Sequence, residues 1–355
     1  MCRGLIITSK RVLVIKLSSM GDLMHALPAL TDACSIWPEM TFDWVVDESF
    51  AEVPTWHPAV KNIFPSAHRR WKNDFWRSFS DGEFSRFYRD LNRNDYDVVI
   101  DAQSNIKSSF ISLLKSGPVH GMDKASVAEQ PAFLAYKHRH FIIKEQHAVQ
   151  RQRQLFANAL GYKVPETDID YGLKSSAFDS ADIQIKTPYL FFVHNASWTT
   201  KLWPEEYWHD LIRMAAEEGY QVVLPGGNKT ELNRASAFAE THTNAIALPK
   251  LDLSTLGGLI KNSAGAFCCD TGLAHLAAMI GIPAVTMYGP TSKKLIGTSG
   301  VNQEHLVSNS DTFTCSPCYK RQCNFHEKNS VMSACMQAFN PESAWALLKA
   351  RMSNK

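Results

Sequence analysis

The sequence predicts an α/β protein made of two doubly wound, Rossmann-like domains. Short runs rich in Val, Ile, Leu and Phe alternate with segments whose apolar residues have helical spacing, as in parallel sheets covered by helices. The alternation restarts in the second half of the chain, after a polar, aperiodic stretch at Pro165–Ser180. With 355 residues, 45% of them hydrophobic, the chain has the length for two domains and the composition for packed cores.

The first half begins with the strand, turn and helix that open such a domain. Arg11–Leu17 has the pattern of a buried strand, residues 18–22 form a polar turn with one glycine, and Leu23–Ala33 reads as an amphipathic helix. The elements expected after it are strands at Phe42–Val46 and Tyr96–Ala102, a short strand closed by His120–Asp123, a loop leading into a helix over Ser66–Arg93, an apolar helix after the polar turn Gln103–Ser108, and a helix at Gln146–Leu160.

The second half repeats the order of strand, turn and helix. Pro204 and the two glutamates after it suit the start of a helix, and Gly219 suits its end. The expected strands are Tyr189–Val193, Gln221–Leu224, Ala264–Cys269 and, as the last strand, Ala284–Tyr288. The expected helices are Pro204–Gly219, one that begins near Glu231, Leu273–Ile280 and a closing helix at Pro341–Met352.

These elements divide the chain into domains. We expect a first domain at residues 1–170, a linker at 171–184, a second domain at 185–340 and a closing C-terminal helix at 341–355. Ligands of doubly wound sheets bind outside the carboxyl ends of the strands. Two facing domains would therefore form one cleft, lined by the turns that follow their strands.

Charge and motif content argue against several functions. The formal net charge of +2 provides no continuous basic face, which argues against nucleic-acid binding. The chain has no G-x-G-x-x-G motif, so a nicotinamide dehydrogenase is disfavoured. No apolar run reaches the roughly 18 residues of a membrane span, and the N-terminal segment lacks the pattern of a secretory signal. We therefore expect a cytoplasmic protein.

Asp22 is the carboxylate of the first polar turn. It follows two hydroxyl residues, Ser18 and Ser19, at the carboxyl end of the first strand. An Asp in this position commonly caps the helix that follows it. The turn also lies at the carboxyl end of the strand, where doubly wound sheets place their ligands.

The second half has the features of an anion site. Asp270-Thr271-Gly272 follows a buried strand and starts a helix, whose free N–H groups and positive dipole end suit a diphosphate. Lys201 offers a point charge for the same phosphates, or is simply a solvated lysine. Glu231 follows the Gly226-Gly227 turn and can accept from two ribose hydroxyls, or is a first-turn helix acid. Together these features indicate a nucleoside diphosphate.

Five motifs together resemble one family. They are K-x-S-S-M-G-D at Lys16–Asp22, D-A-Q at Asp101–Gln103, H-G-M-D at His120–Asp123, K-x-W-P at Lys201–Pro204 and D-T-G-L-x-H at Asp270–His275. The combination is similar to the bacterial ADP-heptose lipopolysaccharide heptosyltransferases of glycosyltransferase family 9, and most similar to their type I branch. The similarity runs in register from about Arg11 to Leu306 and returns in the closing helix.

The resemblance implies a GT-B fold and an inverting, metal-independent transfer without a cofactor. The donor would be ADP-heptose on the C-terminal domain, and the acceptor would be Kdo-lipid A on the N-terminal domain. Asp22 would be the general base that activates a Kdo hydroxyl. The implied donor-binding residues are Ser197, Lys201, Gly226, Glu231, Leu251, Asp270, Thr271, Gly272 and His275. The implied acceptor-binding residues are Ser19, Arg69, Arg70, Lys72 and Gln103.

The resemblance also implies a monomer that works at the inner face of the inner membrane. The acceptor is a lipid, and its carboxylates and phosphates suit the arginine forks of the first half. Trp71 and Trp76 lie among these cations, so this side of the protein could rest on the membrane surface. The alternative is a solvated basic surface without a partner.

Two departures from the type I pattern stand out. Glu129 occupies a position where related sequences have arginine, and Arg139 is a nearby substitute for it. Four cysteines, at Cys315, Cys318, Cys323 and Cys335, are spaced closely enough for a structural zinc site, for free thiols or for a disulfide. None of them is expected in the active site.

Two other functions compete with this assignment. One is a different sugar-nucleotide enzyme of the same fold, such as a type II heptosyltransferase or a nucleotide-sugar epimerase. The other is a noncatalytic nucleotide-sugar sensor. The presence of Asp22 argues against the sensor, because binding alone needs no base there.

Overall fold

The chain folds into two compact units that meet in sequence between Ala177 and Phe178. The computed structural model describes residues 11–73, 81–115, 117–178, 183, 185–308, 312–324 and 333–353. Part of the expected linker, residues 179–182 and 184, lies outside these ranges. Each unit is described by itself.

The first unit contains a parallel sheet with helices on both faces. Its strands are β1 (Arg11–Ile15), β2 (Thr41–Asp47), β3 (Val60–Ser66), β4 (Val98–Asp101), β5 (Val119–Met122) and β6 (His138–His140). Its helices are α1 (Met20–Met24), α2 (Leu27–Ile36), α3 (Glu52–Thr55), α4 (His68–Asn73), α6 (Glu83–Leu91), α7 (Ile106–Leu113) and α8 (Ala148–Leu160), with 3-10 turns η1 (Glu48–Phe50) and η2 (Gln130–Ala135). Among the described residues the strand order is β3-β2-β1-β4-β5-β6.

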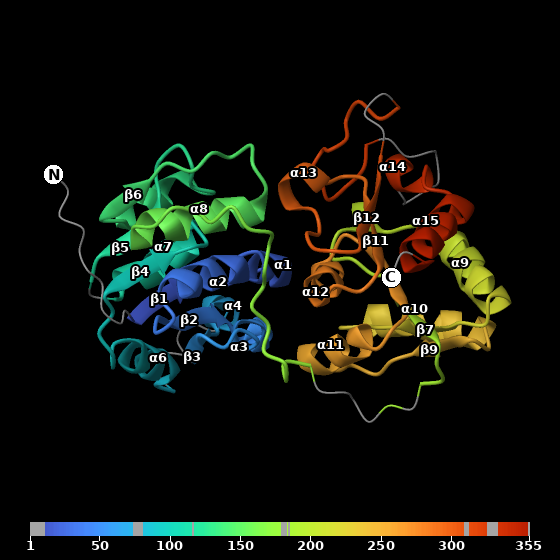
Figure 1. Cartoon of the computed structure of the whole chain (residues 1–355), viewed down its shortest axis with the longest axis horizontal. Helices are drawn as coiled ribbons and strands as arrows, with labels where there is room; N and C mark the ends of the chain where they lie inside the picture. Colours follow the sequence, from blue (N-terminus) through green and yellow to red (C-terminus); the bar gives the residue numbers. More distant parts are fainter. Residues whose placement is uncertain are drawn as a thin grey trace. The chain divides into compact units, whose positions relative to one another are not determined.

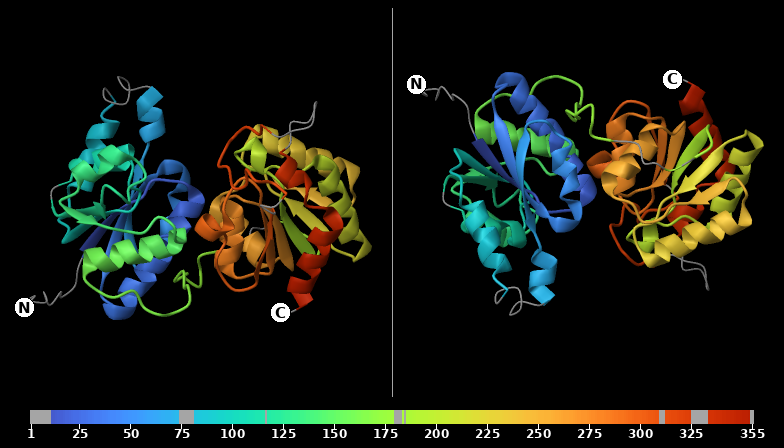
Figure 2. Two further views of the ribbon diagram at one scale, coloured as in Figure 1. Left: turned by 90° about the horizontal axis from the view of Figure 1, so that it is seen from above. Right: turned by 90° about the horizontal axis from the view of Figure 1, so that it is seen from below.

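The central strands of this sheet are covered on both sides. Helices α2 and α8 pack against each other on one face, and α6 and α7 lie on the other (Figure 1, Figure 2). Connections between parallel strands are right-handed, so the direction in which strands are added decides which face a connecting helix covers. Strands are added in one direction after β1 and in the opposite direction after β4, which places helices on both faces. Residues Val12 to Ile15 of β1 are fully buried as a result.

The second unit repeats the arrangement. Its strands are β7 (Tyr189–Val193), β8 (Gln221–Leu224), β9 (Ala245–Ala247), β10 (Gly265–Cys269), β11 (Ala284–Tyr288) and β12 (Gln303–Val307). Its helices are α9 (Glu205–Glu217), α10 (Lys229–Thr241), α11 (Leu253–Lys261), α12 (Gly272–Ile280), α13 (Lys293–Ile296), α14 (Ala334–Gln337) and α15 (Pro341–Ser353), with the 3-10 turn η3 (Thr199–Lys201). Its described strands are parallel, in the order β12-β11-β10-β7-β8-β9.

Aromatic packing holds this second unit together. Trp203 and Trp208 are almost completely buried and lie with their ring centroids 5.2 Å apart, at right angles. Phe192 and Phe267, on the neighbouring strands β7 and β10, pack beside them. Helix α15 packs on α9, so the closing helix predicted at Pro341–Met352 completes the core.

Both sheets have the strand order of a Rossmann fold, which confirms the expected α/β class with two doubly wound domains. In this order the strands are added outward in opposite directions on either side of the junction between the first and fourth strands of each sheet. The switch points are therefore β1/β4 in the first unit and β7/β10 in the second. Asp22 and Gln103 follow the first pair of strands, and Ser197 and Asp270 follow the second pair.

Several predicted elements need correction. The helix predicted at Leu23–Ala33 is two helices, α1 and α2, because the chain ends one helix at His25 and starts another with Pro28 in its first turn. The strand predicted to be last, Ala284–Tyr288, is followed by β12. The prediction also missed the strands β3, β6 and β9 and the helices α3 and α11.

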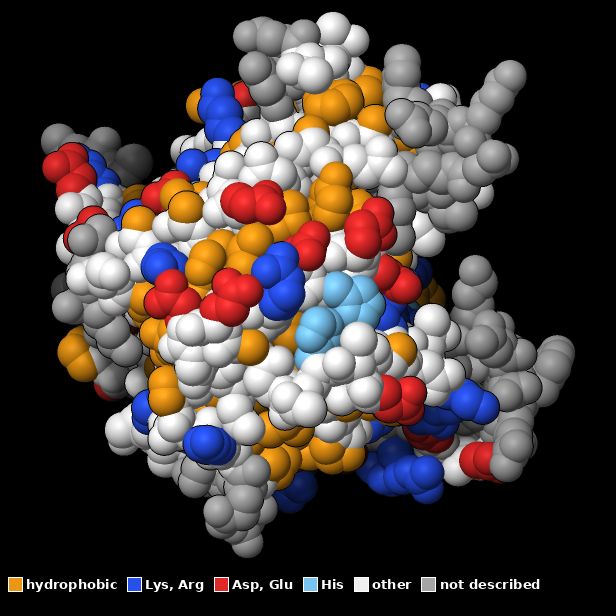
Figure 3. Space-filling view, turned by 90° about the vertical axis from the view of Figure 1, so that its right-hand side faces the viewer, with side chains coloured by type: hydrophobic (Ala, Val, Ile, Leu, Met, Phe, Trp, Pro, Cys, Tyr) orange, Lys and Arg blue, Asp and Glu red, His pale blue; other side chains and the backbone are white. Residues whose placement is uncertain are grey.

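The surface charges bear on nucleic-acid binding, and the lengths of the helices bear on membrane crossing; the sequence argued against both. On the face drawn in Figure 3, acidic and basic side chains are interspersed rather than segregated. A mixed surface of this kind lacks the uniform basic field that nucleic-acid binding needs. In the part of the chain that the structure describes, every helix is too short or too polar to cross a bilayer.

Candidate functional site

Asp22 lies in the first turn of α1, directly after β1. Its Oδ2 accepts hydrogen bonds from the backbone N–H and the hydroxyl of Ser19, at 2.9 and 2.7 Å. Asp22 therefore does close the start of its helix. Within the described residues no other donor contacts the carboxylate, so Oδ1 is available to a ligand.

A buried lysine stands beneath this turn. Lys16, at the end of β1, is only 4% exposed, and its Nζ donates to the carbonyl oxygen of Ala102 at 2.9 Å. Burial lowers the pKa of Lys16, while the negative charges of Asp22 and Asp101 act in the opposite direction. Lys16 therefore lies close enough to Asp22 and Asp101 for their charges to affect its pKa.

Gln103 and Asp101 hold the turn in place from β4. The side-chain oxygen of Gln103 accepts from the backbone N–H groups of Leu17 and Ser18, at 3.1 and 3.2 Å. Asp101 is fully buried and accepts from the N–H groups of Gln103 and Ser104 and from the hydroxyl of Tyr136. Burial raises the pKa of Asp101, and these hydrogen bonds oppose that shift. Gln103, expected to bind the acceptor, therefore also shapes the Asp22 turn.

The Tyr136→Phe substitution tests this support. Tyr136 is buried, and its hydroxyl donates to Asp101 Oδ2 at 2.8 Å. Loss of a hydrogen bond to a buried charged group should lower the free energy of unfolding by about 1.5–3 kcal/mol. Urea unfolding followed by circular dichroism measures this loss. Tyr88→Phe, on the exposed side of α6, is the control and should leave the midpoint unchanged.

The basic residues expected at the acceptor side already have acidic partners. Arg69 lies 3.1 Å from Asp47, and Arg70 bridges Glu48 and Glu83 at 2.9 and 2.7 Å. The hydrogen bonds that Arg70 donates to Glu83 and Glu48 raise the pKa of Arg70. Both guanidinium groups are about half exposed, so an anionic ligand can reach them by competing with the carboxylates. The side chain of Lys72, and Trp76 as a whole, lie outside the described residues.

The departure at Glu129 has a structural explanation. Its Oε2 accepts from the backbone N–H of Ile106 at 2.9 Å, which satisfies a free donor at the start of α7. Arg139 donates to the carbonyl oxygen of Tyr136 and lies over the ring of Phe133. Glu129 thus stabilises a helix end.

In the second unit, Asp270 organises the end of β10. Its Oδ2 lies 2.7 Å from Lys201 Nζ and accepts from the hydroxyl of Thr291 at 2.7 Å. Asp270 is buried, and its Oδ1 lies 4.0 Å from His275 Nε2. Lys201 also packs over the ring of Trp198. The carboxylate of Asp270 therefore positions the Lys201 ammonium, which remains partly exposed.

The start of α12 supplies further donors beside Lys201. Thr271 is the N-cap residue, and its buried hydroxyl oxygen has no hydrogen-bond partner among the described residues. The N–H groups of Gly272 and Leu273 precede the first hydrogen bonds of the helix, which run from Ala274 and His275 to the carbonyl oxygen of Thr271. A cation, a hydroxyl and free N–H groups together form a cradle for phosphate oxygens.

The other residues predicted for the donor lie around this cradle on separate turns. Glu231, in the first turn of α10, accepts from the backbone N–H of Gly227 at 2.8 Å, so it already serves its helix. Gly226 is a glycine because a Cβ there would meet the backbone of Leu232 at 2.8 Å. Ser197 is exposed in the turn after β7, and Leu251 is partly exposed just before α11.

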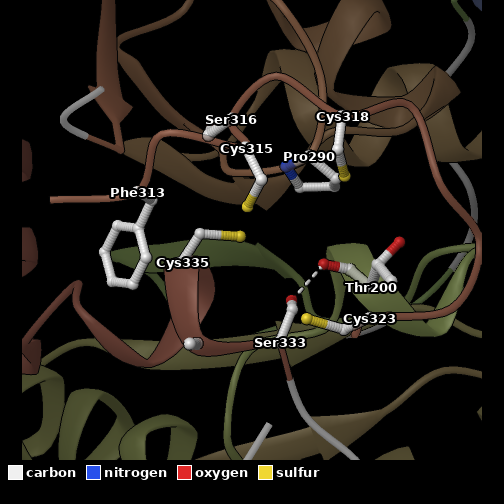
Figure 4. Close-up of a pocket in the computed structure, with 10 residues that line it drawn as sticks. Thr200, Pro290, Phe313, Cys315, Ser316, Cys318, Cys323, Ser333 and Cys335 are labelled. Carbon is white, nitrogen blue, oxygen red and sulfur yellow. Dashed lines mark hydrogen bonds between the residues drawn. The ribbon is translucent and has the colours of Figure 1, made fainter. Parts of the chain in front are cut away.

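Three hydrogen bonds, here called the η3 clamp, hold the η3 turn that carries Lys201. The hydroxyls of Thr199 and Thr200 donate to the carbonyl oxygens of Arg321 and Lys320, at 3.1 and 2.8 Å. From the other side, Ser333 donates to the carbonyl oxygen of Thr200 at 2.6 Å (Figure 4). The segment that contains the cysteines therefore fixes the donor-side lysine indirectly.

The four clustered cysteines line one small cavity beside this clamp. Cys315, Cys318, Cys323 and Cys335 surround a space of about 20 Å³ (Figure 4). Burial raises the pKa of Cys335, and the three other sulfurs act in the same direction. No disulfide bond joins these four cysteines in the structure. Among the described side chains no three possible ligands are arranged to hold a metal ion.

Sequence reasoning missed two residues that complete these sites. Lys16 was counted as part of a motif, yet a lysine that closes an otherwise apolar strand is itself a signal of a buried amine with a hydrogen-bond acceptor, here the carbonyl oxygen of Ala102. Thr291 was noted only as part of a tight turn, but its hydroxyl binds Asp270 from the neighbouring strand. Both pairings cross between elements, so spacing along the chain does not indicate them.

Comparisons with known proteins agree with this chemistry. Residues 84–329 match the model of glycosyltransferase family 9 (heptosyltransferase). Lipopolysaccharide heptosyltransferase 1 of Pseudomonas aeruginosa is 44% identical over 319 residues, which cover 89% of this chain and 88% of the relative.

Solved structures extend the agreement to the fold. The E. coli heptosyltransferase WaaC with ADP superposes with a TM-score of 0.77 at 40% identity, over 85% of this chain and 94% of that one. Its structure with ADP-2-deoxy-2-fluoro heptose gives a TM-score of 0.76 at 39% identity, over the same shares. These matches confirm the resemblance and the GT-B fold expected from it. The chain belongs to glycosyltransferase family 9, the heptosyltransferases.

Proposed function

We propose that the chain transfers L-glycero-D-manno-heptose from ADP-heptose to a Kdo residue of Kdo-lipid A, in the synthesis of the lipopolysaccharide inner core. One observation carries the proposal: Asp22 presents a carboxylate oxygen at the β1/β4 switch point, close enough to Lys16 for its charge to affect the pKa of the lysine. A pure binding protein needs no such base. The relative at 44% identity is named lipopolysaccharide heptosyltransferase 1, and the heptosyltransferase at 40% identity was solved with ADP, which supports the proposal.

In the proposed reaction Asp22 takes the proton of an acceptor hydroxyl. The hydroxyl oxygen attacks the anomeric carbon of the heptose, the bond to the ADP oxygen breaks, and the configuration at that carbon inverts. ADP leaves as an anion whose charge Lys201, Thr271 and the N–H groups of α12 stabilise. The reaction is a single displacement, so one carboxylate suffices and no cofactor is required.

The donor residues have matching roles in this proposal. Lys201 and Thr271 bind the diphosphate, Glu231 accepts from the ribose hydroxyls, and Leu251 packs on the adenine. Asp270 and His275 position these groups. On the acceptor side, Ser19, Arg69, Arg70, Lys72 and Gln103 contact the Kdo carboxylates and the nearby phosphates. The protein acts as a monomer on the cytoplasmic face of the inner membrane.

A transfer assay tests the function. Purified protein is incubated with ADP-heptose and Kdo-lipid A in the presence of a chelator, and the lipid mass and ADP release are followed. A gain of one heptose establishes the proposal. Transfer only to Kdo-lipid A that already carries one heptose would favour the type II enzyme, and ADP binding without transfer would favour the sensor.

The η3 clamp leads to a separate prediction about the KM for ADP-heptose. Thr200→Val keeps the shape of the side chain and removes the hydroxyl that donates to Lys320. We expect the KM for ADP-heptose to rise roughly three- to tenfold, since a neutral hydrogen bond contributes about 1 kcal/mol. The KM for the acceptor should not change, and Thr200→Ser, which retains the hydroxyl, should restore donor affinity. An equal rise in both KM values would contradict a role in positioning Lys201.

A further inference from the structure

A groove in the first unit lies outside the site described above. It runs between the edge strand β3 and helix α6 and has a volume of about 890 Å³. Strand β3 pairs only with β2 among the described strands, so its other edge faces this groove. Five consecutive residues of β3, Lys61 to Pro65, line the groove.

Apolar side chains form part of the floor of the groove. Ile63 and Phe64 contribute from β3, and Phe87 contributes from α6. Trp71 closes one end and meets Phe87 edge to face, with their ring centroids 5.2 Å apart. Such a floor suits the hydrocarbon or sugar-ring part of an amphiphile.

The rim of the groove is cationic. Lys61, Arg86 and Arg93 are exposed and line it. No carboxylate of the described residues forms an ion pair with Arg86 or Arg93, in contrast to Arg69 and Arg70. The lining contains two acids, Glu83 and Asp90. Glu83 is already bound by Arg70, so Asp90 is the acid that remains to balance the three cations of the rim. The rim therefore complements a ligand with more than one negative charge.

The chemistry of β3 argues against another strand as the occupant. Lys61 and Pro65 lie on this edge, and charges and prolines at such positions oppose strand addition. The groove does suit an amphiphile with anionic headgroups, whose phosphates need cations and whose rings need an apolar floor.

The position of the groove fits the acceptor. Strand β3 lies two places from β1 in the sheet, about 10 Å from the strand that carries the Asp22 turn. Helix α4, with Arg69 and Arg70, follows β3 at its carboxyl end, the end of the sheet at which the Asp22 turn lies, and its Trp71 lines the groove. We propose that the β3–α6 groove binds the phosphorylated, lipid-bearing end of the acceptor, while the sugar to be modified lies at Asp22. This inference rests on the proposed function and extends its acceptor site.

Charge reversal in the groove tests the proposal. Arg86→Glu and Arg93→Glu should each raise the KM for Kdo-lipid A by about tenfold or more, since a charge-assisted contact is lost and a repulsion is added. The KM for a water-soluble Kdo glycoside without lipid A, and the KM for ADP-heptose, should stay the same. Arg89→Glu makes the same charge change on the same helix, outside the groove lining, and is the matched control.

The outcomes separate the possible failures. Equal effects on the lipid and the soluble acceptor, or an equal effect of Arg89→Glu, would overturn the assignment. If Arg86→Glu changed the sedimentation coefficient and left every KM unchanged, the groove would be an interface between copies of the chain. If inorganic phosphate inhibited the transfer as strongly as lipid A does, the groove would recognise phosphate alone and not the lipid-bearing end of the acceptor. A wild-type protein that transfers heptose to neither acceptor would instead refute the proposed function.

Discussion

Replacement of Asp22 by Asn is expected to lower kcat by about 10²–10⁴-fold, the usual contribution of a positioned general base. Asparagine keeps the size of the side chain, and its amide oxygen can still accept from Ser19, as Oδ2 of Asp22 does. It cannot take a proton from the acceptor hydroxyl. The KM for ADP-heptose should stay unchanged, because the donor residues lie on the second unit.

Steady-state kinetics and a direct ADP-binding measurement check this expectation. Asp170→Asn is the matched control: Asp170 is another carboxylate of the first unit that accepts a backbone N–H in a turn, from Gly172. It should keep full activity. If Asp22→Asn retained wild-type kcat with intact folding, Asp22 would be a helix cap only.

Lys201→Met is expected to produce the second large effect, a rise in the KM for ADP-heptose of about 10²-fold. In the proposed site the ammonium donates charge-assisted contacts to the diphosphate, each worth about 1.5–3 kcal/mol. Its loss also leaves the buried Asp270 carboxylate with Thr291 but without its cation. An uncompensated negative charge beside the diphosphate would repel the donor further.

Isothermal titration with ADP separates this binding loss from a folding defect. Lys261→Met, an exposed lysine at the end of α11, is the control and should bind ADP like the wild type. The KM for the acceptor should not move in either variant. Loss of stability in Lys201→Met with unchanged ADP affinity would show that the Lys201–Asp270 pair is structural.

The central strands could be predicted from the sequence alone. Tyr189–Val193, Gln221–Leu224 and Ala284–Tyr288 have the same bounds in the structure as in the prediction. Strands buried on both faces appear as continuous apolar runs, so their pattern is independent of what packs on them. The order of these runs and helices was enough to indicate two doubly wound domains.

The edge strands could not be predicted in this way. Residues in β3 are largely exposed or only partly buried, and β6 and β9 are three residues long. An edge strand buries little apolar surface and carries charges such as Lys61, so it has no alternation that marks it as a strand. Its identity comes from the neighbour that pairs with it.

The sequence by itself determined which polar turns follow the buried strands, because turns that contain Asp, Gly and hydroxyl residues are local features. Asp22, Gln103 and Asp270 lie at the carboxyl ends of β1, β4 and β10. Only the tertiary structure decided how these groups are paired. Lys201 meets Asp270 across 69 residues, and Gln103 binds the turn after β1 across 85. Electrostatic and hydrogen-bonding partners are set by distance in space, which strand order and helix packing establish and linear spacing does not.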